Sequence, residues 1–213
     1  MRIVAIGAHL DDIELACGGT LAKAAEEGHQ VRMLVLSESD YSNYHGDVLR
    51  TKDEALQEGR NAACILGVED LVILKNPTKD IPYHSVVVEQ IEAQIDDFQP
   101  DLIFSHWTFD THQAHQGAAL STISAARRFP SILMYEPMVP SGRSYVGFRP
   151  QLYHDISATI GKKLDALRAH EGQFRKYGQS WIDAVEARAR HRGFELGCGY
   201  AESFEILRME LAL

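Results

Sequence analysis

The sequence has few cysteines and no cysteine pairs. Cys17, Cys64 and Cys198 are odd in number and far apart, and no CxxC motif occurs. This pattern indicates neither a disulfide framework nor a structural zinc knuckle, and it favours a reducing compartment. The chain also starts directly on a strand-like run, without a basic and apolar leader. We therefore expect a cytoplasmic protein.

Long apolar runs and basic patches are also missing. No run approaches 18 apolar residues, which predicts no membrane span. The formal net charge of −9, without basic residues interleaved with aromatics, argues against nucleic acid or an anionic membrane as a partner. Neither GxGxxG after the first strand nor GxxxxGK(S/T) occurs, which argues against a nucleotide-binding module. A non-catalytic Rossmann-like binding module stays an alternative on fold grounds alone.

Apolar runs alternate with helical patterns along the chain. Strands are expected at residues 3–6, 30–36, 71–74, 101–105, 132–135, 152–156 and 203–208. Helices are expected at residues 15–27, 48–66, 84–98, 117–127, 157–173 and 181–192, and residues 37–46 read as a polar loop. This alternation predicts an α/β fold, a Rossmann-like three-layer sandwich with a mainly parallel sheet and helices on both faces. Without a composition break or repeat, residues 1–213 are expected to form one domain.

The stretch after the first strand concentrates charge in a strand-to-helix loop. His9, Asp11, Asp12 and Glu14 lie within six residues. Their carboxylates repel one another and burial raises their pKa values, a conflict that a divalent cation would resolve. His9 and Asp12 can face one ion, with Asp11 beside them as a supporting carboxylate. The alternative is an Asp-rich helix start whose carboxylates cap backbone N–H groups.

A second group of histidines follows the strand at residues 101–105. His112 and His115 are three residues apart, which by itself is common on a protein surface. However, both groups follow predicted parallel strands, whose carboxyl ends share one edge of the sheet. Two histidines and one aspartate with an open position form the ligand set of a catalytic zinc site. Fe²⁺ or Co²⁺ suits the same ligands.

Several stretches resemble one known family. Residues 8–14 resemble the AHPDDxE signature of the PIG-L/LmbE-like de-N-acetylase family, with Leu10 in place of proline. Residues 110–115 are similar to its second motif, HxDH, with Ala114 in place of aspartate. Weaker similarities follow in the expected order at residues 58–67, 148–150, 154–157, 163 and 199–204.

The resemblance implies a metal-dependent hydrolase that removes acetyl from an N-acetylated amino sugar, such as an N-acetylglucosamine derivative, or from a glycoside. The family's zinc ligands carry over to His9, Asp12 and His115. The general base carries over to Asp11, and the imidazole that helps stabilise the oxyanion carries over to His112. The expected partner is thus a small acetylated molecule. An amidase acting on another N-acyl or conjugate substrate is the alternative, and a homo-oligomer is left open.

Three further residues are expected on the substrate side. Arg50 corresponds to the family's substrate arginine, although it lies earlier before Glu58 than the commonest spacing. Asp110, two residues before His112, is a candidate to replace the aspartate missing at position 114. Glu14 is expected to support the loop at residues 8–12, which carries the first candidate ligands and is called the metal loop below. His106 is expected at the rim of the site.

Overall fold

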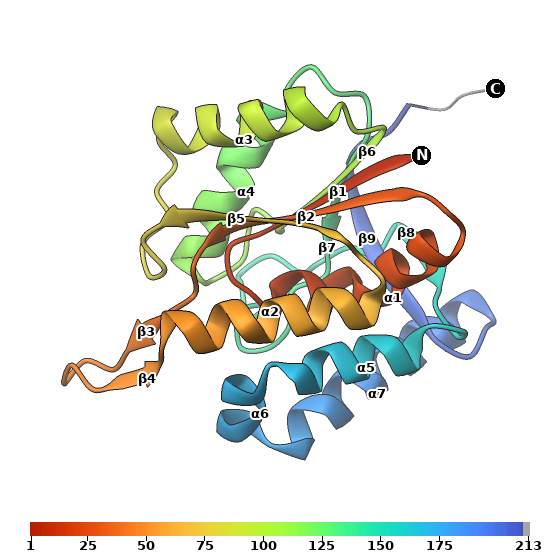
Figure 1. Cartoon of the computed structure of the whole chain (residues 1–213). Coiled ribbons are helices and arrows are strands. Elements are labelled where there is room, and N and C mark those ends of the chain that lie inside the picture. Colours follow the sequence, from red (N-terminus) through yellow and green to blue (C-terminus); the bar gives the residue numbers. More distant parts are fainter. Residues whose placement is uncertain (211–213) are drawn as a thin grey trace.

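A seven-stranded sheet runs through the computed structural model, which describes residues 1–210 (Figure 1). Its order is β5-β2-β1-β6-β7-β9-β8. The strands are β1 (Arg2–Gly7), β2 (Gln30–Ser37), β5 (Asp70–Asn76), β6 (Leu102–Ser105), β7 (Ile132–Tyr135), β8 (Leu152–Asp155) and β9 (Ala201–Arg208). The first five of the order are parallel, and β9 is antiparallel to both β7 and β8.

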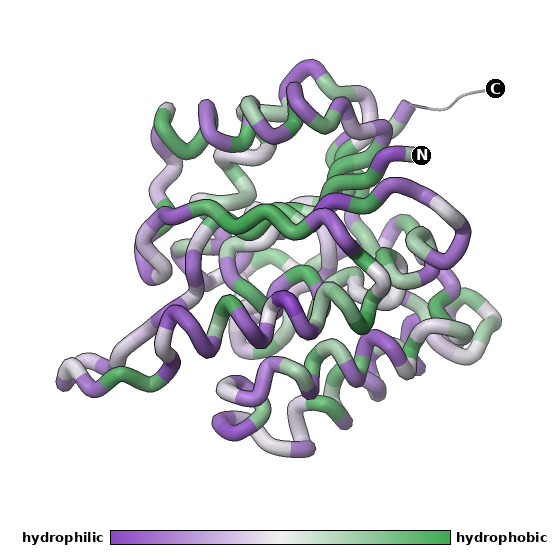
Figure 2. Tube along the Cα trace, in the orientation of Figure 1, coloured by the Kyte–Doolittle hydropathy of each residue, from purple (hydrophilic) through white to green (hydrophobic). Residues whose placement is uncertain are grey.

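Helices cover both faces of this sheet (Figure 1). One layer holds α3 (Ser85–Phe98) and α4 (Gln113–Ala125); the other holds α1 (Asp12–Glu26), α2 (Lys52–Leu66), α5 (Ile160–Ala169), α6 (Glu171–Tyr177) and α7 (Gln179–Leu196). Alternate residues of β1 serve the two layers: Ala5 joins the cluster around α1 and α2, and Val4 and Ile6 join the cluster around α3 and α4. Figure 2 shows the apolar central strands between helices of mixed polarity. The predicted three-layer α/β fold is confirmed.

The expected polar loop and the start of the next helix were wrong in part. Residues 41–50 form a small projecting hairpin of β3 (Tyr41–Ser42) and β4 (Val48–Arg50) (Figure 1). Helix α2 begins only at Lys52, because the Thr51 side chain accepts the Glu54 backbone N–H while the Glu54 carboxylate accepts the Thr51 N–H. This reciprocal cap fixes the helix start four residues later than the apolar pattern predicted.

Two other helix boundaries also differ from expectation. Helix α4 begins at Gln113 instead of Gly117, because the His112 ring caps the Ala114 N–H. The single helix expected at residues 157–173 is broken at His170, whose ψ of 69° is not helical. The His170 ring bonds Glu14 on one side and Arg50 on the other, so a buried polar contact interrupts the helix.

The topology creates a crevice at the carboxyl ends of β1 and β6. From β1 the chain adds β2 and then β5 on one side, and it then crosses to β6 on the other side of β1. The loops after β1 and β6 therefore diverge, and such a switch point is where open α/β sheets bind ligands. Within residues 1–210, no helix has both the length and the apolar character needed to cross a bilayer.

Candidate metal centre

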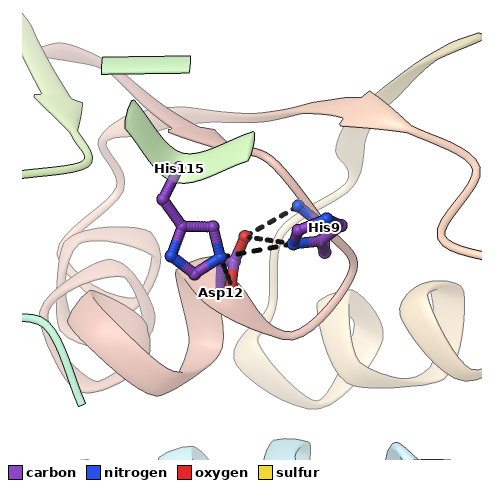
Figure 3. A group of neighbouring side chains, drawn as sticks. All are labelled: His9, Asp12 and His115. Carbon is purple, nitrogen blue, oxygen red and sulfur yellow. Dashed lines mark hydrogen bonds and ion pairs between the residues drawn. The ribbon is translucent and has the colours of Figure 1, made fainter. Parts of the chain in front are cut away.

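Three donor atoms converge in the crevice. His9 Nδ1 lies 3.3 Å from Asp12 Oδ2, and His115 Nε2 lies 3.3 Å from both Asp12 Oδ1 and His9 Nδ1. Figure 3 shows the three side chains pointing toward one another from the loop after β1 and from α4. Ligands placed tetrahedrally at the usual zinc distances lie about 3.3 Å apart. The donor set thus fits one metal ion with a position left for another ligand.

The outer nitrogens of both histidines are held by hydrogen bonds. His9 Nε2 donates to the Thr78 carbonyl at 2.8 Å, and His115 Nδ1 donates to Asp110 Oδ2 at 2.9 Å. Each bond places the ring hydrogen on the outer nitrogen, which leaves His9 Nδ1 and His115 Nε2 with free lone pairs toward the centre. Ligand histidines in metalloproteins are oriented in this way.

The electrostatics of the cluster favour a positive charge at its centre. Burial lowers the pKa of His115, but the Asp12 and Asp110 carboxylates outweigh this and raise it to about 10. Burial raises the pKa of Asp12, but the imidazoles of His115, His106 and His9 hold it well below its usual range. A metal cation would take the place that a proton on His115 otherwise fills.

Asp11 lies beside the donor set with its carboxylate in the pocket. Its φ of 140° is uncommon for a residue with a side chain, and its Oδ2 accepts a hydrogen bond from Gln173 Nε2 at 2.8 Å. Burial and the neighbouring Asp12 charge raise the pKa of Asp11 to about 6. A carboxyl group with this pKa is suited to exchange protons near neutral pH.

His112 lines the same pocket, and its surroundings lower its pKa. Its Nδ1 accepts the Ala114 N–H at 3.3 Å, so the neutral ring carries its hydrogen on Nε2. Burial, together with the positive charges of His115 and His9, lowers the pKa of His112 to about 4. In its neutral form the imidazole can donate a hydrogen bond from Nε2, and its role toward an oxyanion stays a prediction.

Arg50 reaches the pocket, but its guanidinium is already bound. Nη2 lies 2.6 Å from Glu58 Oε2 and 3.2 Å from His170 Nδ1, and Nη1 donates to the Leu10 carbonyl at 3.2 Å. Only 2% of Arg50 is exposed. Its contacts tie α2 and His170 to the residue before Asp11, which makes Arg50 a brace of the metal loop as well as part of the pocket wall.

The other two substrate-side candidates lie behind the pocket. Asp110 is 2% exposed; besides holding His115, its Oδ1 accepts the His112 backbone N–H at 2.7 Å. Glu14 is 1% exposed, and its Oε1 lies 3.0 Å from His170 Nε2. These positions argue against direct substrate contact and for support of the site. Asp110 thus supplies a carboxylate near the position where residue 114 has none. It binds the ring of His115 and only the backbone of His112.

His106 was expected at the rim and is instead buried beneath the cluster. Its Nε2 accepts the Ala8 N–H at 2.9 Å and lies 3.2 Å from Asp12 Oδ2. Its ring stacks on His115 with centroids 4.3 Å apart. The side chain therefore supports both the loop after β1 and a candidate ligand. Its place directly after a strand was the only signal available in the sequence.

The pocket over the cluster has a volume of about 380 Å³, within the usual range for small-molecule sites. Its walls include residues that no motif indicated: Thr78, Lys79, Met138, Val139, Pro140, Gln173, Lys176, Tyr177 and Trp181. They come from the β5–α3 loop, the segment after β7, and helices α6 and α7. The large side chains of Met138, Tyr177 and Trp181 thus line the pocket together with its charged side chains.

The fold and the site define a class, α/β proteins with an open two-histidine, one-carboxylate centre at the sheet's switch point. Residues 4–126 match the family model described as GlcNAc-PI de-N-acetylase, PIG-L. The chain belongs to that family.

Similar proteins agree with this assignment. The uncharacterized deacetylase YaiS of Escherichia coli K12 is 32% identical over 79% of this chain and 90% of its own. Diacetylchitobiose deacetylase of Thermococcus kodakarensis is 26% identical over 97% of this chain and 83% of its own. The crystal structure of the conserved protein TT1542 from Thermus thermophilus superposes with a TM-score of 0.83 at 25% identity, covering 100% of this chain and 97% of the other.

Proposed function

We propose that this protein is a zinc-dependent hydrolase that removes the acetyl group from an N-acetylated amino sugar or glycoside. The observation that carries the proposal is the triangle of His9, Asp12 and His115 donor atoms with the Asp11 carboxylate beside it. The names of the relatives, a deacetylase of diacetylchitobiose among them, support the same reaction. Fe²⁺ or Co²⁺ in place of zinc is compatible with these ligands.

A bound zinc ion would supply a Lewis acid that polarises the acetamide carbonyl and acidifies water. Around it the chain's own groups divide the proton transfers. The Asp11 carboxylate accepts a proton from the attacking water and then delivers it to the departing sugar nitrogen. His112 donates its Nε2 hydrogen to the carbonyl oxygen as negative charge develops there. Asp110 and Thr78 hold the two ligand rings throughout.

The activity is tested by measuring acetate release from the zinc-loaded protein. We expect turnover of methyl N-acetylglucosaminide or N,N′-diacetylchitobiose to exceed that of simple N-acyl amides without a sugar. Turnover restricted to non-sugar amides would favour the alternative amidase. Absence of acetate release from every compound, with zinc bound, would refute the proposal.

The role of Asp11 is tested by Asp11→Asn, which keeps the shape of the side chain and removes its basicity. We expect kcat to fall by roughly 10²- to 10⁴-fold, the usual contribution of a general base. Zinc content, measured by elemental analysis, should not change because Asp11 is not among the three donors. Asp183→Asn on the exposed surface of α7 is the matched control. Normal turnover by Asp11→Asn would remove Asp11 from the mechanism.

A further inference from the structure

Two lysines without a carboxylate partner stand at the rim of the pocket. Lys79 and Lys176 both line it and are both exposed, and neither forms an ion pair with any residue in the described range 1–210. Lys79 Nζ donates to the Ser42 carbonyl at 2.6 Å. Lys176 Nζ lies 5.4 Å from the ring centroid of Tyr41. Two ammonium groups from distant segments therefore lie against adjacent residues of β3, an arrangement that we call the rim pair.

The charges around the pocket leave the rim pair unbalanced. Asp11 and Asp12 are the carboxylates among the lining residues, and a divalent cation held beside them would offset both. The guanidinium of Arg50 is already paired with Glu58. Among the residues that line the pocket, the two lysines then remain as an excess of positive charge, in a protein whose net charge is −9.

The acidic residues nearest in the chain to β3, Glu38 and Asp40, form no ion pair with either lysine of the rim pair. Asp40 Oδ1 accepts the hydroxyl of Thr78 at 3.2 Å, and Glu38 Oε1 lies 2.7 Å from Lys52 Nζ. Lys176 is further held by the ring of Tyr177, whose centroid lies 4.6 Å from its Nζ. The aromatic faces fix the ammonium group without neutralising it.

We propose that the rim pair binds an acidic group, a carboxylate or a phosphate, that the acetylated sugar substrate carries outside its acetamide. The proposal rests on the proposed function, because it concerns the same pocket. The two ammonium groups attract an anion, and this attraction would add to that of a cation bound by His9, Asp12 and His115. Selection for an acidic substrate is thus assigned to Lys79 of the β5–α3 loop and Lys176 of α6. Arg50 instead supports the loop after β1.

The test compares kcat/KM for an acidic and a neutral substrate. Zinc-loaded protein is assayed with N-acetylglucosamine 6-phosphate, N-acetylglucosamine 1-phosphate and neutral methyl N-acetylglucosaminide. At low salt we expect wild type to prefer at least one phosphorylated sugar by about tenfold or more, with the preference shrinking as salt screens the charges. In the double variant K79Q/K176Q the acidic-to-neutral ratio should fall by about tenfold.

Lys75→Gln is the matched control, because Lys75 is an exposed lysine of β5 that does not line the pocket. We expect it to keep the wild-type ratio. An equal preference for neutral and acidic sugars in wild type would overturn the proposal, as would a ratio that the double variant leaves unchanged. Either result, with the neutral sugar still turned over, would leave the deacetylase function intact.

A binding measurement separates the two proposals if turnover fails. Glucosamine 6-phosphate and glucosamine resemble the reaction products and need no chemistry, so their affinities can be measured by calorimetry. The double variant K79Q/K176Q keeps the metal ligands, so any binding of phosphate to the metal should persist in it. A lower affinity of the double variant than of wild type for the phosphorylated sugar therefore measures the contribution of the rim pair. Equal affinities of wild type and double variant would refute the rim pair whatever the activity.

Discussion

At the scale of single residues, burial and neighbouring charges set the pKa values of the acids and bases in the site. The donor atoms of His9, Asp12 and His115 lie as far apart as the ligand atoms of one metal ion. A hydrogen bond to the outer nitrogen fixes the ring of each histidine. Asp11 and Asp12 are neighbours in sequence with opposite pKa shifts, because the imidazoles surround Asp12 whereas burial dominates at Asp11. One carboxylate is thereby suited to bind a cation and the other to carry a proton.

The raised pKa of Asp11 predicts a pH dependence. Only the deprotonated carboxylate can act as a base, so activity should fall as pH falls through the pKa. In the metal-free protein, carbon NMR should detect one aspartate titrating near 6, missing from Asp11→Asn. A bound cation would counteract this rise and lower the pKa of Asp11, so the acidic limb of kcat/KM should lie at or below pH 6. If every aspartate of the metal-free protein titrates below 5, the environment assigned to Asp11 is wrong.

At the scale of elements, the metal loop is held from below by α2. Gly59 of α2 packs directly under Leu10, and a Cβ at position 59 would lie 2.4 Å from Leu10 Cδ2. Leu10 is fully buried and precedes Asp11, so it has little room to move. The contact couples the packing of a helix to the geometry of the site, which no local pattern in the sequence showed.

Gly59→Ala should therefore destabilise the protein although alanine favours helices. We expect a loss of about 1–3 kcal/mol in the free energy of unfolding by urea, typical of overpacking, together with lower turnover. Gly161→Ala in α5 is the matched control, since a Cβ there meets nothing within 4 Å. That variant should lose no stability and gain up to about 1 kcal/mol. Equal stabilities of the two variants would disprove the Leu10 contact.

At the scale of the whole molecule, the candidate metal centre draws its donors from both sides of the switch point in the sheet. His9 and Asp12 follow β1, and His115 follows β6, on the two sides of the switch point. A ligand bound only by the folded state adds its binding free energy to stability. The metal should therefore stabilise the fold as well as serve the reaction.

Chelation of the metal should lower the melting temperature. Zinc at about 1,000 times its Kd contributes about 4 kcal/mol, which for a chain of this size is a shift of roughly 8–16 °C. Calorimetry with and without EDTA measures the shift. His115→Ala should lose most of it, whereas His191→Ala, an exposed residue of α7, should keep it. An unchanged melting temperature after confirmed metal removal would contradict the proposed centre.

The sequence by itself determined the strand–helix alternation, the α/β class and the identity of the candidate ligands. The alternation and the fold class follow from the apolar runs, and the candidate ligands follow from the resemblance of residues 8–14 and 110–115 to the family motifs. Tertiary structure decided the break at His170, the burial of His106 and the contact of Arg50 with Glu58. It also brought Lys79 and Lys176 to one rim. The reason is physical, because hydrogen-bond partners, burial and pKa values depend on segments that meet only after folding.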